Sequence, residues 1–279
     1  MRTGILRAPS ALPGFGLSFG ITLTLLSVIV LLPLAALLGR GATIGPAELW
    51  TVIANRRVLA ALSLSFRAAL VASLFNLAFG LLLAWVLVRY RFPGRRLVDA
   101  AVDLPFALPT AVAGIALTAL YAPNGFFGQA FAAAGIRIAY TEYGIWLALI
   151  FVGMPFVVRT VQPVIEEVDS ECEEASATLG ASRLYTLRRV VLPVLTPALL
   201  TGFALALARS VGEYGSVIFI AGNLPYKTEI APLLIVIRLE EFNYDAAAAI
   251  GIAMLVIAFT ILLAINAIQV WTRRRIGNG

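Results

Sequence analysis

Residues 165–193 read Ile-Glu-Glu-Val-Asp-Ser-Glu-Cys-Glu-Glu-Ala-Ser-Ala-Thr-Leu-Gly-Ala-Ser-Arg-Leu-Tyr-Thr-Leu-Arg-Arg-Val-Val-Leu-Pro, a charged stretch between two long apolar runs. Ser170 and Glu173 have capping-box spacing, and acidic residues crowd the first turn, where the helix dipole favours negative charge. Gly180 is placed to end this helix in a left-handed conformation. The stretch therefore predicts a helix over 171–179 that stops at a glycine corner.

A second helix is expected beyond the corner, with Ser182 as its cap. Arg188 and Arg189 fall in its last turn, and Pro193 should halt it where the next apolar run begins. The first helix would rise roughly 14 Å at about 1.5 Å per residue, so it would project as a rigid peg. A solvated loop, whose charges only keep it out of an apolar phase, is the alternative that these residues leave open.

Six apolar runs surround this stretch. Hydrophobic residues make up 61% of the 279 residues, charged residues only 13%, and the mean hydropathy is +0.94, far from the balance of a soluble domain. A helix needs about 20 residues to cross a hydrocarbon core. The sequence therefore predicts an all-α polytopic membrane protein with six transmembrane helices, at 15–38, 68–88, 102–120, 144–164, 195–220 and 246–271.

The first run follows a short basic segment, so a signal peptide is the alternative to a helix that is retained. Its length of about 24 residues exceeds the roughly 7 to 15 of a signal peptide's apolar region, which favours a retained helix. After this run, residues 44–62 mix apolar and basic side chains around Pro46 and Trp50. This pattern is typical of a short amphipathic helix lying on the outer interface of the membrane.

Basic residues are unevenly distributed around the runs. With six spans, both termini and the second and fourth connections share one side, which carries 13 of the 21 basic residues. The other side carries 7, and Arg209 lies inside a run. The positive-inside rule then places both termini in the cytoplasm. This topology signal explains the net charge of +6, so no nucleic-acid partner is expected.

The chain lacks the residues that many metal and nucleotide sites require. It has no histidine and a single cysteine, Cys172, which excludes a disulfide framework and a Cys/His metal site. A phosphate-binding P-loop needs Gly-Lys-Ser or Gly-Lys-Thr, and the only lysine, Lys227, follows Tyr226. We therefore expect no catalytic residue, no metal and no cofactor in this chain.

The charged stretch resembles the EAA loop of ABC importer permeases. That pattern is E-A-A, three residues, G, nine residues, I, one residue, L-P, and here the stretch from Glu174 to Pro193 matches its spacing. Ser176 replaces the second alanine and Val190 replaces isoleucine. The resemblance implies a type I ABC importer permease fold, in which 1–60 is an N-terminal segment with the first span and interfacial helix, 61–271 the permease core and 272–279 a cytoplasmic tail.

In that family the loop forms a coupling helix, which docks into a cleft of a separate ATPase subunit. ATP and Mg²⁺ would then be bound by this partner. The resemblance implies that the residues that contact the ATPase or flank the contact are Glu173, Glu174, Ala175, Ser176, Gly180, Arg183, Leu192 and Pro193.

The fifth run carries a charged pair, Arg209 and Glu213, four residues apart on one helical face. Ionisable groups at such depth are costly and usually face a bundle interior or an aqueous cavity. An internal ion pair without a substrate role is the alternative. We expect this face to line a pathway, where an anion meets Arg209 or the free backbone N–H groups around 212–216. Candidate pathway residues are Arg209, Ser210, Gly212, Glu213, Gly215 and Ser216.

The third run contains Pro105, Pro109 and Gly114, which would free backbone hydrogen-bonding groups inside the membrane. Such groups are tolerated where protein or a water-filled cavity satisfies them. Pro105 and Pro109 are therefore further pathway candidates, and simple kinking of the helix is the alternative.

Segments 103–114 and 209–222 resemble sulfate and molybdate permeases, and 121–125, 222–238 and the first span resemble the T-type sulfate/thiosulfate permeases. This resemblance implies an importer in the plasma (inner) membrane. Its expected partners are a second permease of the W type, two ATPase subunits, an external sulfate-binding protein and membrane lipid. A molybdate/tungstate permease, or an ion-coupled secondary transporter that uses Glu213, is the alternative. A membrane scaffold is a third possibility.

Overall fold

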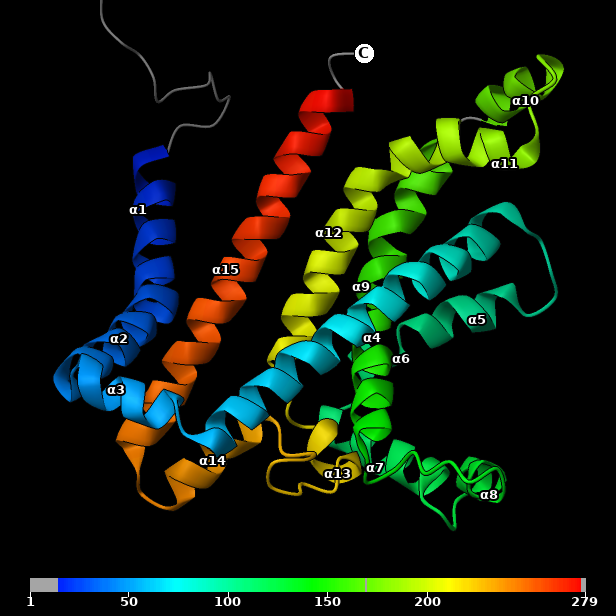
Figure 1. Ribbon diagram of the computed structural model, residues 1–279. Helices are drawn as coiled ribbons and strands as arrows, with labels where there is room; N and C mark the ends of the chain where they lie inside the picture. Colours follow the sequence, from blue (N-terminus) through cyan, green and yellow to red (C-terminus); the bar gives the residue numbers. More distant parts are fainter. Residues whose placement is uncertain (1–14, 169, 277–279) are drawn as a thin grey trace, which may run out of the picture.

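The computed structural model describes residues 15–168 and 170–276, with the side chains of 170–173 and 272–276 left out. Within these ranges every regular element is helical (Figure 1), which confirms the all-α prediction. The helices are α1 (Phe15–Leu26), α2 (Leu32–Ile44), α3 (Pro46–Ile53), α4 (Arg56–Arg89), α5 (Arg95–Val102), α6 (Leu104–Ala107), α7 (Thr110–Tyr121), α8 (Phe126–Ala133), α9 (Glu142–Glu167), α10 (Ser170–Thr178), α11 (Arg183–Thr186), α12 (Leu192–Val211), α13 (Val217–Ile220), α14 (Ala231–Glu240) and α15 (Tyr244–Ile276).

Five helical segments in the described part of the chain are long and apolar enough to cross a membrane. They correspond to the first, second, fourth, fifth and sixth predicted runs. A sixth candidate is the pair α7 and α8, which are bent by 45° relative to each other. The five segments are Phe15–Ile44, Arg56–Arg89, Glu142–Glu167, Arg183–Val211 and Tyr244–Trp271.

The third run is broken, so the single helix predicted over 102–120 is wrong. Leu108 has an extended backbone (φ −88°, ψ 135°) between α6 and α7. The ring of Pro109 disfavours a helical conformation at the residue before it, which explains the position of this break. Two short helices, α6 and α7, cover most of the predicted run, with α5 ending at its start and α8 following it.

The fifth span also differs from the prediction at both of its ends. It begins at Arg183 and ends at Val211, whereas we expected it to start near 195 and continue to 220. Pro193 does not halt a separate helix. A π-helical turn, Leu187–Val191, joins α11 to α12, and Pro193 lies in the first turn of α12, where a missing N–H is tolerated.

The segment 44–62, predicted as one interfacial helix, is split between α3 and α4. The helix α3 ends at Ile53, and the Asn55 side chain accepts a hydrogen bond from the Arg57 backbone N–H (2.9 Å), capping α4. Residues 56–62 therefore start the second span and do not lie in an interfacial helix. The expected boundary between residues 60 and 61 falls inside α4.

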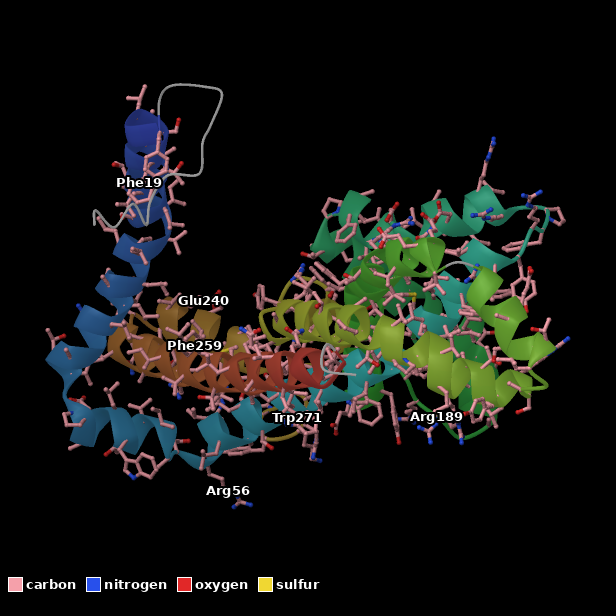
Figure 2. The ribbon with its side chains drawn as sticks, turned by 90° about the horizontal axis from the view of Figure 1, so that it is seen from above. Phe19, Arg56, Arg189, Glu240, Phe259 and Trp271 are labelled. Carbon is pink, nitrogen blue, oxygen red and sulfur yellow. The ribbon has the colours of Figure 1, made fainter. Side chains whose placement is uncertain are left out.

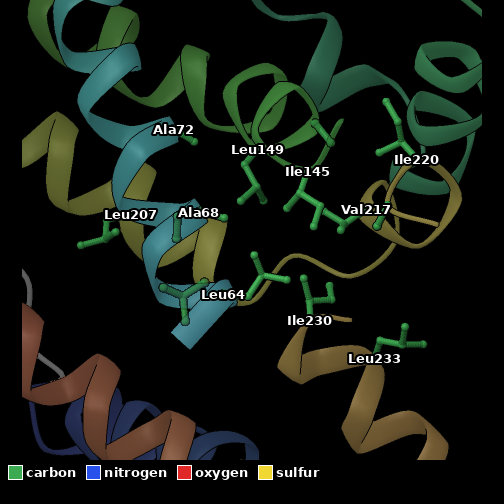
Figure 3. Packing of buried hydrophobic residues seen from close by; sticks show 14 of the residues in the cluster. Leu64, Ala68, Ala72, Ile145, Leu149, Leu207, Val217, Ile220, Ile230 and Leu233 are labelled. Atoms are coloured by element: carbon green, nitrogen blue, oxygen red, sulfur yellow. The ribbon is translucent and has the colours of Figure 1, made fainter. Parts of the chain in front are cut away.

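The core of the bundle is formed by α4, α9 and α12, which pack against one another along much of their length. Figure 3 shows a cluster in which Ala68 and Ala72 of α4 lie near Leu149 of α9. Small residues allow such helices to approach closely. A Cβ atom added to Gly202 of α12 would lie 3.0 Å from the Val157 Cα atom of α9.

The first span stands apart from this core. Phe15–Leu31 contains no buried residue, and α1 extends away from the bundle in both views (Figures 1 and 2), with Phe19 exposed on it. The next part, α2, contacts α15 and α3. At one end of the bundle lie α10, α11 and the end of α15, and α3, α13 and α14 lie at the other end (Figure 1). The fourth connection and the C-terminal end of the last span therefore share one end of the bundle, and the first and fifth connections share the other, as expected for six spans.

Replacing Gly202 with leucine should destabilise the bundle. The added side chain must push α12 away from the α9 backbone, at a cost of about 2 kcal/mol in the free energy of unfolding. Thermal unfolding of the purified protein in detergent measures this loss. Gly20→Leu in α1 is the matched control, because nothing lies within 4 Å of a Cβ at that position. Equal stability of the two variants would contradict the close approach.

Candidate functional site

The segment 168–192, called the charged loop below, folds around a left-handed corner. Gly180 has φ +81°, and nothing lies within 4 Å of a Cβ built on it, so the backbone conformation alone favours glycine. The Ala181 N–H donates to the Ser176 carbonyl (3.1 Å), and the Gly180 N–H donates to the Ala177 carbonyl (3.0 Å). These two bonds form a Schellman motif. The predicted corner is confirmed, and α10 ends one residue earlier than expected.

A hydroxyl pair holds the two arms of the charged loop together. The Ser182 side chain accepts a hydrogen bond from the Tyr185 N–H (3.3 Å), which confirms the predicted cap of the second arm. Ser176 Oγ lies 2.8 Å from Thr186 Oγ1, and Thr186 is buried. Thr186 was not among the residues predicted for this site. Its signal was the serine at a position where the resembled pattern has alanine.

The outer surface of the charged loop is open and partly apolar. Leu179 is 88% exposed beside the corner, and Leu184 and Tyr185 are each 56% exposed. Large apolar side chains exposed together mark a surface that another protein or a membrane can cover. Of the residues expected at a partner contact, Glu174, Ala175, Gly180 and Arg183 are exposed, Ser176, Leu192 and Pro193 are partly buried, and the Glu173 side chain lies outside the described residues.

The base of the charged loop is tied to the second span. Arg89, the last residue of α4, donates through Nη2 to the Val168 carbonyl (3.0 Å) at the end of α9. Its guanidinium carbon also lies 5.5 Å from the centre of the Trp85 ring, within the range of a cation–π contact. Two spans therefore share an anchor where the loop begins.

The fifth span ends at a buried carboxylate. The side chain of Glu213 is 2% exposed, and its Oε2 lies 2.5 Å from Arg209 Nη1. Its Oε1 accepts hydrogen bonds from the Ser216 backbone N–H and from Ser216 Oγ, both at 2.9 Å. The predicted ion pair is confirmed, although Glu213 lies just beyond the end of α12 and not within it.

These contacts change the expected roles of the pathway candidates. Ser210, Glu213 and Ser216 are buried within the chain, and the Ser216 N–H is already bonded to a carboxylate. The expectation that the Ser216 N–H is free to meet an anion is therefore wrong for this conformation. Arg209, with a side chain that is 35% exposed, and the exposed Gly212 remain accessible.

The breaks in the third and fifth spans meet backbone to backbone. A Cβ on Gly215 would lie 2.2 Å from Thr110 Oγ1, and a Cβ on Gly114 would lie 2.4 Å from the Ser216 carbonyl oxygen. Pro109, which is exposed, precedes Thr110 at the start of α7 and therefore lies beside this junction. Pro105 lies in α6, on the other side of the Leu108 break. Glycine is therefore required at 114 and 215, because a larger side chain would prevent the two segments from approaching this closely.

An arginine of the fourth span holds the broken third span in place. Arg159 of α9 binds Asp103 through Nε and Nη2 (2.8 and 2.7 Å) and Asp99 through Nη1 (2.6 Å). Arg159 is one of the 13 basic residues that the sequence assigns to one side of the membrane, but it lies inside α9. Within the described ranges no three His, Cys, Asp or Glu residues come together to hold a metal ion. Asp99, Asp103 and Glu213 are paired with arginines instead.

Replacing Gly180 with valine should loosen the charged loop. A β-branched residue is strained at φ +81° by about 1 to 3 kcal/mol, so backbone amides over 174–186 should exchange hydrogen roughly tenfold faster. Gly180→Asn is the control, because asparagine tolerates the left-handed region. Exchange measured by mass spectrometry should distinguish the two variants, and unchanged exchange in Gly180→Val would argue against the corner.

Comparison with known proteins identifies the family. The sequence profile of the binding-protein-dependent transport system inner membrane components matches residues 76–278. The sulfate transport system permease protein CysT of Salmonella typhimurium is 53% identical over 265 residues, covering 95% of this chain and 96% of that protein. CysT of Synechocystis is 47% identical, covering 91% of this chain and 89% of that protein.

Solved structures share the fold. A chain of a bacterial ABC transporter involved in the import of the acidic polysaccharide alginate has a TM-score of 0.75 and 17% identity, covering 93% of this chain and 96% of that chain. A chain of the MetNI methionine ABC transporter has a TM-score of 0.57 and 19% identity, covering 77% and 95%. The predicted type I permease fold is thus confirmed. The chain belongs to the binding-protein-dependent transport system inner membrane components, in the group of the CysT permeases.

Proposed function

We propose that this chain is the transmembrane permease subunit of an ATP-driven sulfate/thiosulfate importer. The observation that carries the proposal is the similarity over 95% of the chain to a protein named as a sulfate transport system permease. Segments matched along nearly the whole length include the charged loop and both broken spans. The chain is itself non-catalytic, because it has no P-loop to hold a nucleotide.

The charged loop couples this subunit to a separate ATPase, which binds ATP and Mg²⁺. Three features support this role: the Schellman corner fixes the angle between the arms, the Ser176–Thr186 contact closes them, and Leu179 stands exposed at the tip. An apolar side chain in that position gains free energy when a partner covers it. Glu174, also exposed, supplies a charged contact beside it, and Arg183 flanks this contact.

The assembly contains a second permease of the W type, two ATPase subunits and an external sulfate-binding protein. A solved relative of the fold is described as an alginate transporter in complex with a substrate-bound periplasmic protein. That title supports an external binding protein here as well. The exposed first span, with no buried residue in Phe15–Leu31, leaves surface for a neighbouring subunit or lipid.

The subunit lies in the inner membrane with both termini in the cytoplasm. The excess of basic residues at the ends shared by the termini and the charged loop supports this orientation. It also places the charged loop on the side where ATP is available. The opposite end, with α3, α13 and α14, then faces the external binding protein (Figure 1).

The solute passes along the accessible face around Arg209 and Gly212. The Arg209 side chain stays partly exposed while it pairs with Glu213. A positive group therefore lies next to the backbone around Gly212. Pro109 is exposed at the adjoining break of the third span. A fixed guanidinium there lowers the cost of bringing a dianion into a low-dielectric constriction.

An ion-coupled mechanism is less favoured by the same geometry. Both oxygens of Glu213 are already bound, one to Arg209 and one to Ser216. A carboxylate held in this way would have to lose those bonds before it could receive a coupling proton or cation. A molybdate/tungstate permease shares the proposed mechanism and differs only in its solute.

Placing an aspartate at Leu179 should weaken the contact with the ATPase. A charge at the centre of an apolar contact must be desolvated, and we expect roughly tenfold less ATPase subunit in a pull-down from detergent, equivalent to about 1.4 kcal/mol. Leu97→Asp is the control, since Leu97 of α5 is 76% exposed but lies outside the charged loop. Equal recovery of the ATPase with both variants would remove Leu179 from the contact.

Removing both charges of the Arg209–Glu213 pair should separate their structural and transport roles. Arg209→Gln with Glu213→Gln keeps side-chain size and an oxygen that can accept from Ser216, so assembly should survive. Sulfate uptake in proteoliposomes should fall at least tenfold, because the positive charge is lost. Arg209→Gln alone leaves a buried carboxylate unpaired, at a cost of about 3 to 5 kcal/mol, and should also reduce assembly. Uptake by the double variant at the parent rate would eliminate the substrate role of Arg209.

A further inference from the structure

A groove of about 1030 Å³ lies between the second span and the charged loop. One wall is formed by α4 and the residues just after it, 78–92, and the other by residues 177–195 of the charged loop and α12. We call it the α4–α12 groove. Its volume is at the upper end of the range for sites that hold drug-sized ligands, about 300 to 1,000 Å³.

Both walls of the α4–α12 groove change from apolar to basic along its length. At the end nearer the middle of the spans, the walls are apolar and include Ala78, Leu82 and Leu195. At the end nearer the charged loop, Arg91 follows α4 and Arg183 begins α11, so both walls finish in a guanidinium. An apolar floor with a basic mouth fits a ligand that has an apolar tail and an anionic head.

The two arginines at the mouth are available to such a head group. Both are exposed, and neither makes an ion pair with a carboxylate of the described residues. This distinguishes them from Arg57, Arg159 and Arg209, which bind carboxylates within the chain. Further basic residues follow in the same two segments, at Arg95, Arg96, Arg188 and Arg189.

We propose that the α4–α12 groove binds an anionic phospholipid, with an acyl chain along Ala78, Leu82 and Leu195 and the phosphate between Arg91 and Arg183. Basic pockets between membrane helices attract anionic head groups, and each buried CH₂ of an acyl chain adds about 0.8 kcal/mol. A free phosphate ion would leave the apolar length of the groove uncovered. The lipid bridges the second span to the charged loop, so the lipid composition of the membrane acts on the loop's position.

The test is native mass spectrometry of the detergent-purified transporter, with whatever subunits copurify, after incubation with phosphatidylglycerol or phosphatidylcholine. The parent should retain phosphatidylglycerol at least tenfold better than phosphatidylcholine. Arg91→Ala with Arg183→Ala should abolish this preference. Arg56→Ala with Arg137→Ala is the matched control, because both are exposed arginines at the opposite end of the bundle, and it should retain the preference.

A second variant avoids the charged loop altogether. Ala78→Trp fills the inner end of the α4–α12 groove while leaving both arginines in place, and it should reduce phosphatidylglycerol retention at least tenfold. Leu74→Trp, on α4 outside the groove lining, should not. Full retention by Ala78→Trp, displacement of the lipid by millimolar inorganic phosphate, or cross-linking of a cysteine at Leu82 to a second permease chain would each overturn the proposal. None of these readouts depends on which solute is transported.

Discussion

The carboxylate of Glu213 is the contact on which the central part of the bundle depends. Inside a membrane, a backbone N–H without a partner costs several kcal/mol, so a helix can stop there only if another group accepts its hydrogen bonds. Glu213 does this for Ser216, while Arg209 compensates its charge. The backbone after Val211 is thereby free to turn, and α7 packs directly against it through Gly114. One buried acid therefore permits the breaks in two spans to meet.

The other internal charges follow the same principle at the ends of the bundle. Arg159 holds the start of the broken third span through Asp99 and Asp103. Arg57 forms a two-fold contact with the buried Glu229, joining the start of α4 to the segment before α14 at 2.8 and 2.6 Å. Such bidentate pairs fix orientation as well as distance. Arginines on the long helices α4 and α9 therefore position two segments that are too short or too irregular to pack as spans.

The sequence predicted the features that depend on local chemistry and missed those that depend on tertiary contact. Hydropathy located the long helices, and the glycine at 180 with its preceding acidic turn indicated the corner. The helix of 102–120 was wrong because hydropathy alone does not register the break that Pro109 imposes at Leu108. Similarly, Thr186 escaped prediction because its partner Ser176 lies across the corner, 10 residues earlier in the chain. The sequence separation of Arg57 and Glu229 hid their pairing in the same way.

The continuity of the fifth span has a mechanical consequence that the expected separate helices would not have. From Arg183 to Val211 the chain is helical for 29 residues. The π-helical turn at 187–191 joins α11 to α12, and the helix changes direction there (Figure 1). The charged loop and the accessible face at Arg209 are therefore joined by a continuous helical segment and not by an irregular linker.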